Sequence, residues 1–178
     1  YLDKTGKLLW WRYLSKATKV DNAWINASGR DGYILPQGVL FTTINTFNRE
    51  NWQLPTPVEH PSNSSLFMFS PEGKFKYQYQ GRAPIENLAF AAGKAACAIG
   101  RNVRTHAYTA HGLVVLDLAS GREEAFYPTA GPCQAAGISD DGRWVAGVEA
   151  PAITPEGKII GAYRLHIWDR LKREESND

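Results

Sequence analysis

The sequence predicts an all-β protein built from four-stranded antiparallel sheets, and three observations carry this prediction. Apolar residues alternate with polar ones or form short runs, and no window has the i, i+3, i+4, i+7 spacing of an amphipathic helix. Glycine turns of the kind that close tight hairpins separate these runs. The turns also recur along the chain with a period of about 48 residues.

The strand pattern is clearest in three stretches of the second half of the chain, residues 113–118, 144–148 and 163–168. Turn signals separate the runs and lie at Thr5-Gly6, Pro71-Glu72-Gly73, Ser120-Gly121 and Asp141-Gly142. Glycine supplies the positive φ that short hairpin turns require, and an aspartate beside it accepts backbone N–H bonds across the turn. Many short strands separated by such turns indicate an antiparallel architecture.

Two classes of hairpin alternate along the chain. The first has an apolar strand, a turn, a glycine, a basic residue and a second strand, and it occurs at residues 1–10, 66–75 and 115–123, with a half copy at 165–170. The second is rich in alanine and glycine and occurs at residues 88–96 and 136–146, with a looser copy at 24–34. Two hairpins per repeat give four strands, which is the blade of a β-propeller.

The repeats divide the chain into blades of one partial propeller domain spanning residues 1–178. An outer strand is expected within residues 1–15, followed by blades at about 20–80, 84–127 and 132–170. Three blades do not close a ring, since propellers have at least four. We therefore expect the chain to be a fragment of a larger propeller, or two copies to pair into a six-bladed ring. A sandwich repeat is the alternative, and it explains the regular period less well.

Several segments resemble the repeats of known propeller families. The segment Leu2-Asp3-Lys4-Thr5-Gly6-Lys7-Leu8-Leu9-Trp10 resembles the repeat of quinoprotein-type propellers, and residues 116–122 match it more weakly. Residues 138–146 resemble a hairpin of WD-type and TolB-like propellers, and residues 165–169 resemble their strand that closes with Trp-Asp. These repeats specify fold rather than function. The resemblance slightly favours an extracytoplasmic compartment over a cytoplasmic one.

Composition and motif searches exclude several classes of function. The net charge of +2 argues against a nucleic-acid binder, and the longest weakly polar run is too short to insert into a membrane. His106 and His111 have no third ligand at motif spacing, so we expect no metal. No nucleophile elbow, phosphate loop or dinucleotide fingerprint is present, and the vicinal cysteine pair of quinoprotein dehydrogenases is missing, so we expect no cofactor. Cys97 and Cys133 are either buried free thiols or a single bridge.

Long connections between the second and third strands of each blade are the expected binding surface. They span residues 45–64, 101–111 and 150–160, and on the blade assignment they leave the same face. The first carries a proline-flanked aromatic, and the second is dense in cationic and hydrogen-bonding side chains. The candidate binding residues are Trp52, Arg101, Arg104, His106, Tyr108 and His111.

The function predicted from these features is a non-enzymatic scaffold that binds a protein or peptide through its loop face. The partner is an acidic or aromatic peptide, or the rest of the propeller, or a second copy. The alternative is a ligand-binding, hydrolase or oxidoreductase propeller whose active residues lie partly outside this chain. Alternation also predicts a set of side chains buried within or between blades, namely Trp10, Phe69, Leu116, Trp144 and Trp168.

Overall fold

The protein is entirely β in the part of the chain that its structure describes. The computed structural model describes residues 1–20, 23–46, 60–100, 110–154 and 156–172. Every strand pairing is antiparallel. These residues form no helix, and so none that could cross a membrane. The chain forms two compact units, Tyr1–Pro84 and Ile85–Asp178.

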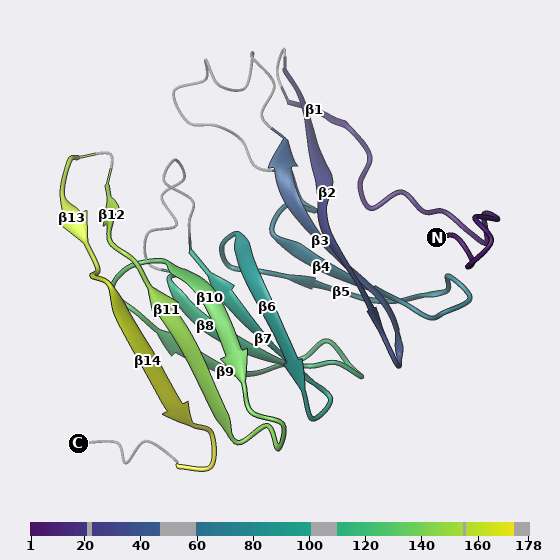
Figure 1. Ribbon diagram of the computed structural model, residues 1–178. Helices are drawn as coiled ribbons and strands as arrows, with labels where there is room; N and C mark the ends of the chain where they lie inside the picture. The colour runs from purple at the N-terminus through teal and green to yellow at the C-terminus, as the bar shows by residue number, and fades with distance from the viewer. Residues whose placement is uncertain (21–22, 47–59, 101–109, 155, 173–178) are drawn as a thin grey trace. The chain divides into compact units, whose positions relative to one another are not determined.

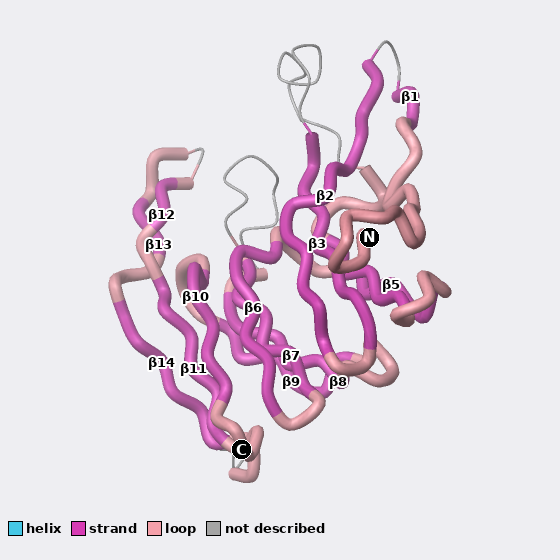
Figure 2. The backbone as a smooth tube through the Cα atoms, turned by 45° about the vertical axis from the view of Figure 1, so that its right-hand side comes forward, coloured by secondary structure: helices cyan, strands magenta, loops and turns pink. Residues whose placement is uncertain are grey.

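The first unit contains one five-stranded sheet in which neighbours in sequence are neighbours in space (Figure 2). Its strands are β1 (Thr18–Val20), β2 (Ala23–Leu35), β3 (Gly38–Thr46), β4 (Ser65–Phe69) and β5 (Phe75–Gln80). The turn between β4 and β5 follows the predicted glycine signal, since Gly73 has φ of 80° and its N–H donates to the carbonyl of Ser70 at 2.9 Å. This unit is therefore an antiparallel meander of five strands, whereas a four-stranded blade was expected over residues 20–80.

The indole of Trp10 packs against one face of this sheet. The side chain packs with Val39, Phe67 and Phe69, and its Nε1–H donates to the carbonyl of Pro71 at 2.9 Å. A Cβ built on Gly73 would lie 2.6 Å from the indole ring, so only glycine lets the turn approach it this closely. Residues before β1 thereby become part of the core of this unit.

The second unit has two larger sheets and a two-stranded hairpin (Figure 1). The four-stranded sheet consists of β6 (Ile85–Ala91), β7 (Lys94–Ile99), β8 (Gly112–Asp117) and β9 (Glu123–Pro128). The three-stranded sheet consists of β10 (Cys133–Ile138), β11 (Trp144–Glu149) and β14 (Arg164–Asp169). Between β11 and β14 the chain forms a separate hairpin of β12 (Ala152–Ile153) and β13 (Ile159–Ile160).

Local turn chemistry fixes the register of the hairpins in this unit. Ala92 and Gly93 both have positive φ, 48° and 71°, and they join β6 to β7 as the two central residues of a tight turn. At the β10–β11 turn, Asp141 accepts hydrogen bonds from the hydroxyl of Ser139 and the N–H of Arg143. Gly142, with φ of 71°, completes that turn. Both turns lie where the glycine signals predict them.

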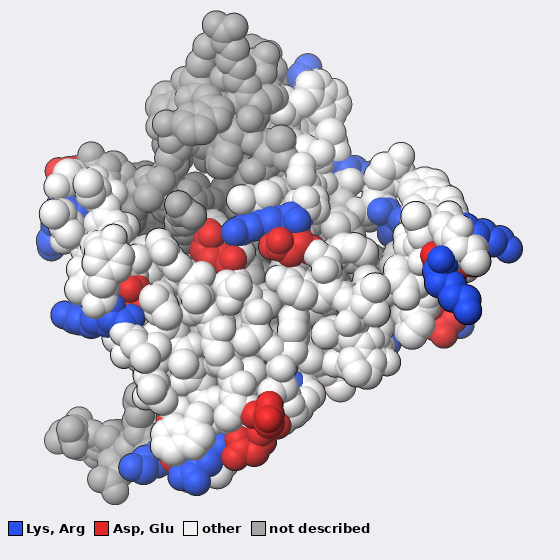
Figure 3. Space-filling view, viewed as in Figure 1, with Lys and Arg blue, Asp and Glu red and all other residues white. Residues whose placement is uncertain are grey.

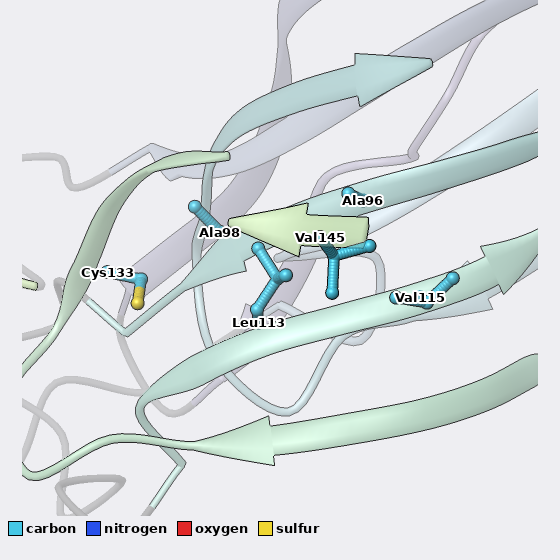
Figure 4. Close-up of a cluster of buried hydrophobic side chains, with 6 residues drawn as sticks. All are labelled: Ala96, Ala98, Leu113, Val115, Cys133 and Val145. Carbon is cyan, nitrogen blue, oxygen red and sulfur yellow. The ribbon is translucent and has the colours of Figure 1, made fainter. Parts of the chain in front are cut away.

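The core of the second unit lies between its two larger sheets. Small and branched side chains form this core, as Figure 4 shows. They are those of Ala96, Ala98, Leu113, Val115, Cys133 and Val145. Trp168, Tyr127 and Ile138 pack around this cluster and are partly buried. The alanine- and glycine-rich hairpins of the sequence therefore serve close sheet-to-sheet packing. Cys97 and Cys133 are both free thiols, and both are buried.

The structure corrects one prediction of burial. Trp10, Phe69 and Leu116 are buried and Trp168 is half-buried, but Trp144 is 42% exposed. The neighbouring Val145 takes the inward position and Trp144 lies on the opposite face of β11. The Trp144 ring instead lies under the guanidinium of Arg143, 4.9 Å from its centroid. The predicted strand is therefore present, but the inward face was assigned to the wrong residue.

Candidate functional site

Polar residues gather where the long connections of the second unit leave its two larger sheets. We call this group the loop-end cluster and define it as His111, Thr129, Gly131, Glu149 and His166. It joins three chain segments: the connection from β7 to β8, the turn from β9 to β10, and the connection from β11 to β14. The strands β7 and β11 therefore end, and β8 and β14 begin, at the same end of this unit.

Glu149 is the centre of the loop-end cluster. It is the last residue of β11, and its side chain is fully buried. Its Oε1 accepts the N–H of Gly131 at 2.9 Å and the N–H of Ala162 at 3.1 Å. Its Oε2 accepts a hydrogen bond from Nε2 of His166 at 2.6 Å. One carboxylate thus ties the β9–β10 turn and the base of the β12–β13 hairpin to the sheet.

The charge of Glu149 is maintained by these contacts. Burial acts to raise the pKa of the Glu149 carboxyl, but the hydrogen bonds from His166, Gly131 and Ala162 outweigh it and hold the pKa below its usual value. The carboxylate is therefore ionised at neutral pH although it is enclosed. A buried ionised group with its acceptor sites filled by backbone donors is suited to holding loops in place.

His111 closes the base of the β7–β8 connection. Its ring lies against Gly100 at the other end of that connection, where a Cβ would be 2.5 Å from the imidazole. Its Nδ1–H donates to the carbonyl of Ala130 at 3.4 Å. Burial lowers the pKa of His111, against smaller raising effects of Ala130 and Glu149. The ring is buried and does not form part of the exposed surface.

His166 is held on both sides by its neighbours. It pairs with Gly147 across the β11–β14 ladder, and its ring stacks on Trp168 with centroids 5.3 Å apart and an interplanar angle of 5°. Trp168 in turn stacks on Tyr127 at 5.0 Å. Gly147 leaves room for this stack, since a Cβ there would lie 3.3 Å from the indole of Trp168. The aromatic column therefore fixes the orientation of the imidazole that binds Glu149.

The β12–β13 hairpin projects beyond the ends of β11 and β14 in both views of the fold (Figures 1 and 2). Its turn is closed by two hydrogen bonds, from the N–H of Thr154 to the carbonyl of Lys158 at 2.8 Å and from the N–H of Gly157 to the carbonyl of Thr154 at 2.9 Å. Ile153 and Ile159 are cross-strand partners, so their side chains share one face.

The apolar side chains of this hairpin face solvent. Ile153 is 63% exposed and Ile159 is 69% exposed, and Tyr163, which follows the hairpin, is 84% exposed. Lys158, Arg164 and one acidic residue, Glu156, are also exposed beside them. The hairpin therefore presents two isoleucines and one tyrosine beside two cationic side chains, on a base fixed by Glu149.

Most of the binding residues expected from the sequence cannot be placed. Trp52, Arg101, Arg104, His106 and Tyr108 lie outside the described residues. His111 is the one candidate that the structure places, and it is buried in the loop-end cluster.

The sequence predicts a connection at residues 150–160 but not the hairpin within it. The signal was present, because Thr154-Pro155-Glu156-Gly157-Lys158 repeats the pattern of Ser70-Pro71-Glu72-Gly73-Lys74. In both turns the glycine has φ of 80° and donates its N–H to the first residue of the motif. Ile153, Ile159 and Tyr163 flank this repeated turn and could have been identified from it. Glu149 had no such signal, since a single glutamate at a strand end is ordinary.

A metal site and a reactive thiol are two further possibilities that the described residues allow to be checked. They contain no group of three or more histidine, cysteine or acidic side chains placed to hold a metal ion. Burial raises the pKa of the Cys133 thiol, although a hydrogen bond with Thr129 opposes the rise, so this thiol is a weak nucleophile. The sequence matches no protein-family model. A comparison with curated proteins finds no significant relative.

Proposed function

We propose that the chain is a non-enzymatic scaffold of the β-propeller type that binds a protein or peptide through its loop end. The observation that carries this proposal is the β12–β13 hairpin, whose exposed Ile153, Ile159 and Tyr163 stand on a base held by a buried carboxylate. Exposed apolar side chains on an ordered element mark interaction surfaces more often than scattered single residues do.

The propeller assignment is supported by the way the two larger sheets of the second unit repeat each other. In both, the third strand pairs with the second over six residues and ends with an aspartate, at the pairs Lys94–Asp117 and Trp144–Asp169. In both, the long connection lies between the second and third strands. Neighbouring blades of a propeller are expected to repeat their strand order in this way and to pack face to face; here the repetition covers the first three strands of each sheet.

Fixing the hairpin before binding favours affinity. Binding to an element that is already ordered costs less conformational entropy than binding that must first order a flexible loop. The three hydrogen bonds that Glu149 accepts hold the hairpin base to the sheet end, and the backbone bonds of the Thr154–Lys158 turn close its tip. Ile153 and Ile159 are therefore presented at a defined spacing, as an anchor for an apolar pocket.

The partner chemistry follows from the side chains around the hairpin. Two isoleucines and a tyrosine require an apolar or aromatic surface, and the exposed Lys158 and Arg164 favour carboxylates at its edge. The best fit is a protein segment with apolar or aromatic residues flanked by acidic ones. Arg101 and Arg104, which follow β7 in the sequence, agree with the same preference.

The arrangement of the loop-end cluster favours this function over an enzymatic one. The Glu149–His166 pair resembles an acid–base pair in composition, but Glu149 is fully buried and its Oε1 accepts two backbone N–H groups. His166 is stacked on Trp168 and directs Nε2 at the carboxylate. Both side chains are thus held by structural contacts. Cys133 is buried and is therefore not placed to act as the nucleophile of a hydrolase.

Selection of peptides by the purified chain tests the proposal. A random peptide library is selected on the wild type, and each enriched peptide is measured by calorimetry against wild type, Ile153→Ser and Ile159→Ser. The proposal predicts enrichment of apolar or aromatic peptides with acidic flanks, and at least a tenfold loss of affinity in each variant. Phe75→Ser, which removes an apolar side chain 58% exposed in the first unit, is the matched control and keeps full affinity. Failure to enrich any sequence, or equal affinity in all variants, would refute the proposal.

A further inference from the structure

The three-stranded sheet β10–β11–β14 has one buried face and one exposed face. The exposed face, here called the outer face, is defined by Trp144, Val148, Leu165 and Ile167. Leu165 is 66% exposed and Ile167 is 61% exposed, while Trp144 and Val148 are each more than two-fifths exposed. Val148 pairs with Leu165 across the β11–β14 ladder, so their side chains lie together on this face.

The neighbouring sheet shows what normally covers such a face. Counting back from the aspartates that end the two strands, Leu113 and Val115 of β8 correspond to Leu165 and Ile167 of β14. Leu113 and Val115 are fully buried, because the β10–β11 hairpin packs on them through Cys133 and Val145. The same positions in β14 have the same aliphatic character but are exposed to solvent. The outer face is therefore built like a sheet-packing surface.

The charge distribution of the outer face points to the kind of sheet that covers it. Asp169 lies at one end of the face, and the guanidinium of Arg143 neutralises it with Nη2 2.7 Å from Oδ2. Side chains of β14 alternate between the two faces of the sheet. Arg164 and His166 therefore lie on the opposite face, together with their partners Glu149 and Gly147, and add no charge to the outer face. Figure 3 shows few charged side chains over β11 and β14 between the two ends of these strands.

A face without uncompensated charge is compatible with its own copy. In a two-fold dimer every surface patch meets itself, so like charges on the patch would repel, whereas apolar side chains are self-complementary. Two sheets pack face to face at about 10 Å through interdigitating aliphatic side chains, which is the arrangement already present between the two sheets of this unit. A second copy offers the same surface at the same concentration as the chain itself.

From these observations we infer that the chain forms a two-fold dimer in which the outer face of β10–β11–β14 packs on the outer face of a second copy. Leu165 and Ile167 of the edge strand β14 and Val148 of β11 supply the aliphatic contacts of this interface, and Trp144 lies towards one end of it. The inference is independent of the hairpin, since Ile153, Ile159 and Tyr163 remain exposed beyond the end of the sheet. The dimer would present two hairpins to a partner.

Sedimentation velocity on the whole chain, from about 1 to 100 µM, tests the inference. The wild type is expected to sediment as a species of twice the chain mass at the upper concentrations. Ile167→Lys and Leu165→Lys place a charge against its own copy, and each should raise the dimer dissociation constant at least tenfold. Ile159→Lys is the matched control, because it changes an equally exposed isoleucine of a neighbouring strand, and it leaves the dimer unchanged. Circular dichroism confirms that all variants remain folded.

A wild type that is monomeric at every concentration would overturn the inference, and so would dimers that persist in both lysine variants. Mass that keeps growing with concentration would also overturn it, because an open assembly is not two-fold. Crosslinking gives a second measurement: Ile167→Cys should form dimers with a short bis-maleimide, and Ile159→Cys should not. The outcomes also separate this inference from the binding function, since lysine at position 167 should leave peptide affinity per chain unchanged.

Discussion

Gly131 and Gly161 lie backbone against backbone in the second unit. A Cβ built on Gly161 would be 2.5 Å from the Cα of Gly131, and one built on Gly131 would be 2.5 Å from the carbonyl oxygen of Ala150. This contact places the N–H of Gly131 and the N–H of Ala162 on the same oxygen of Glu149. The approach of two glycines is thus the condition under which one buried carboxylate fixes both the β9–β10 turn and the β12–β13 hairpin.

Gly161→Ala should therefore destabilise the protein more than Gly157→Ala does. Both glycines have positive φ, 71° and 80°, so alanine at either position costs about 1–2 kcal/mol in backbone strain. At Gly157 nothing lies within 4 Å of the added Cβ, whereas at Gly161 the backbone of Gly131 must shift, which adds about 2 kcal/mol. Urea unfolding of the two variants measures the difference. Equal losses of free energy would show that the two backbones are not in contact.

Glu149→Gln should lower the free energy of unfolding by about 3 kcal/mol. The amide oxygen is a weaker, uncharged acceptor for the N–H groups of Gly131 and Ala162, and the NH₂ group faces the Nε2 of His166 in place of an acceptor. Glu72→Gln is the control, because that carboxylate is exposed in a turn of the first unit, so its substitution should cost far less than that of Glu149. Amide hydrogen exchange of Ala162 should speed up in Glu149→Gln alone. Unchanged exchange there would contradict the anchoring role of the carboxylate.

Stability should fall as pH decreases below the usual histidine pKa of 6.5, in part because of His111. Its folded-state pKa is lowered by burial, so the unfolded chain takes up a proton at a pH at which the folded chain does not. The contribution of neutral His111 is complete above pH 6.5 and is lost as pH falls toward the lowered value, with a slope of up to about 1.4 kcal/mol per pH unit. His111→Gln should flatten the unfolding free energy between pH 6.5 and 5 relative to wild type. Parallel curves for the two proteins would contradict the burial of this ring.

Truncating two tryptophans should separate the buried position from the exposed one. Trp10→Ala removes an indole packed on Phe69 and Gly73 and should cost about 3–5 kcal/mol. Trp144→Ala removes an exposed ring that lies under the Arg143 guanidinium, and should cost about 1 kcal/mol or less in the monomer. Thermal unfolding at low concentration checks both. A large loss for Trp144→Ala would restore the inward assignment that the sequence predicts.

The sequence predicts the strands and turns well because their signals are local. A turn with a positive-φ glycine or a capping aspartate depends on only four or five consecutive residues. The turns at Gly73, Gly93 and Gly142 are therefore visible in the sequence without knowledge of the rest of the fold. The face of a strand is less local. In β11 the consecutive residues Trp144 and Val145 are both apolar, so the sequence does not show which of them points inward. Packing against the neighbouring sheet decides that Val145 does.

The loop-end cluster was beyond prediction because it depends on pairing between distant residues. Glu149 meets Gly131 eighteen positions away and His166 seventeen positions away, and nothing in the spacing indicates those contacts. The β12–β13 hairpin was predictable in principle, because its turn repeats the motif of residues 70–74. Its strands are only two residues each, too short to show an alternating pattern within the long connection.

The most direct test of the binding function is the footprint of a selected peptide on the folded chain. Amide resonances of ¹⁵N-labelled protein are followed during titration with the tightest peptide from the library. The proposal predicts that the largest shifts fall on Ala152, Ile153 and residues 158–163, with smaller shifts at Gly131. Shifts concentrated at the opposite turns, residues 118–122 and 139–143, with none in the β12–β13 hairpin, would contradict it.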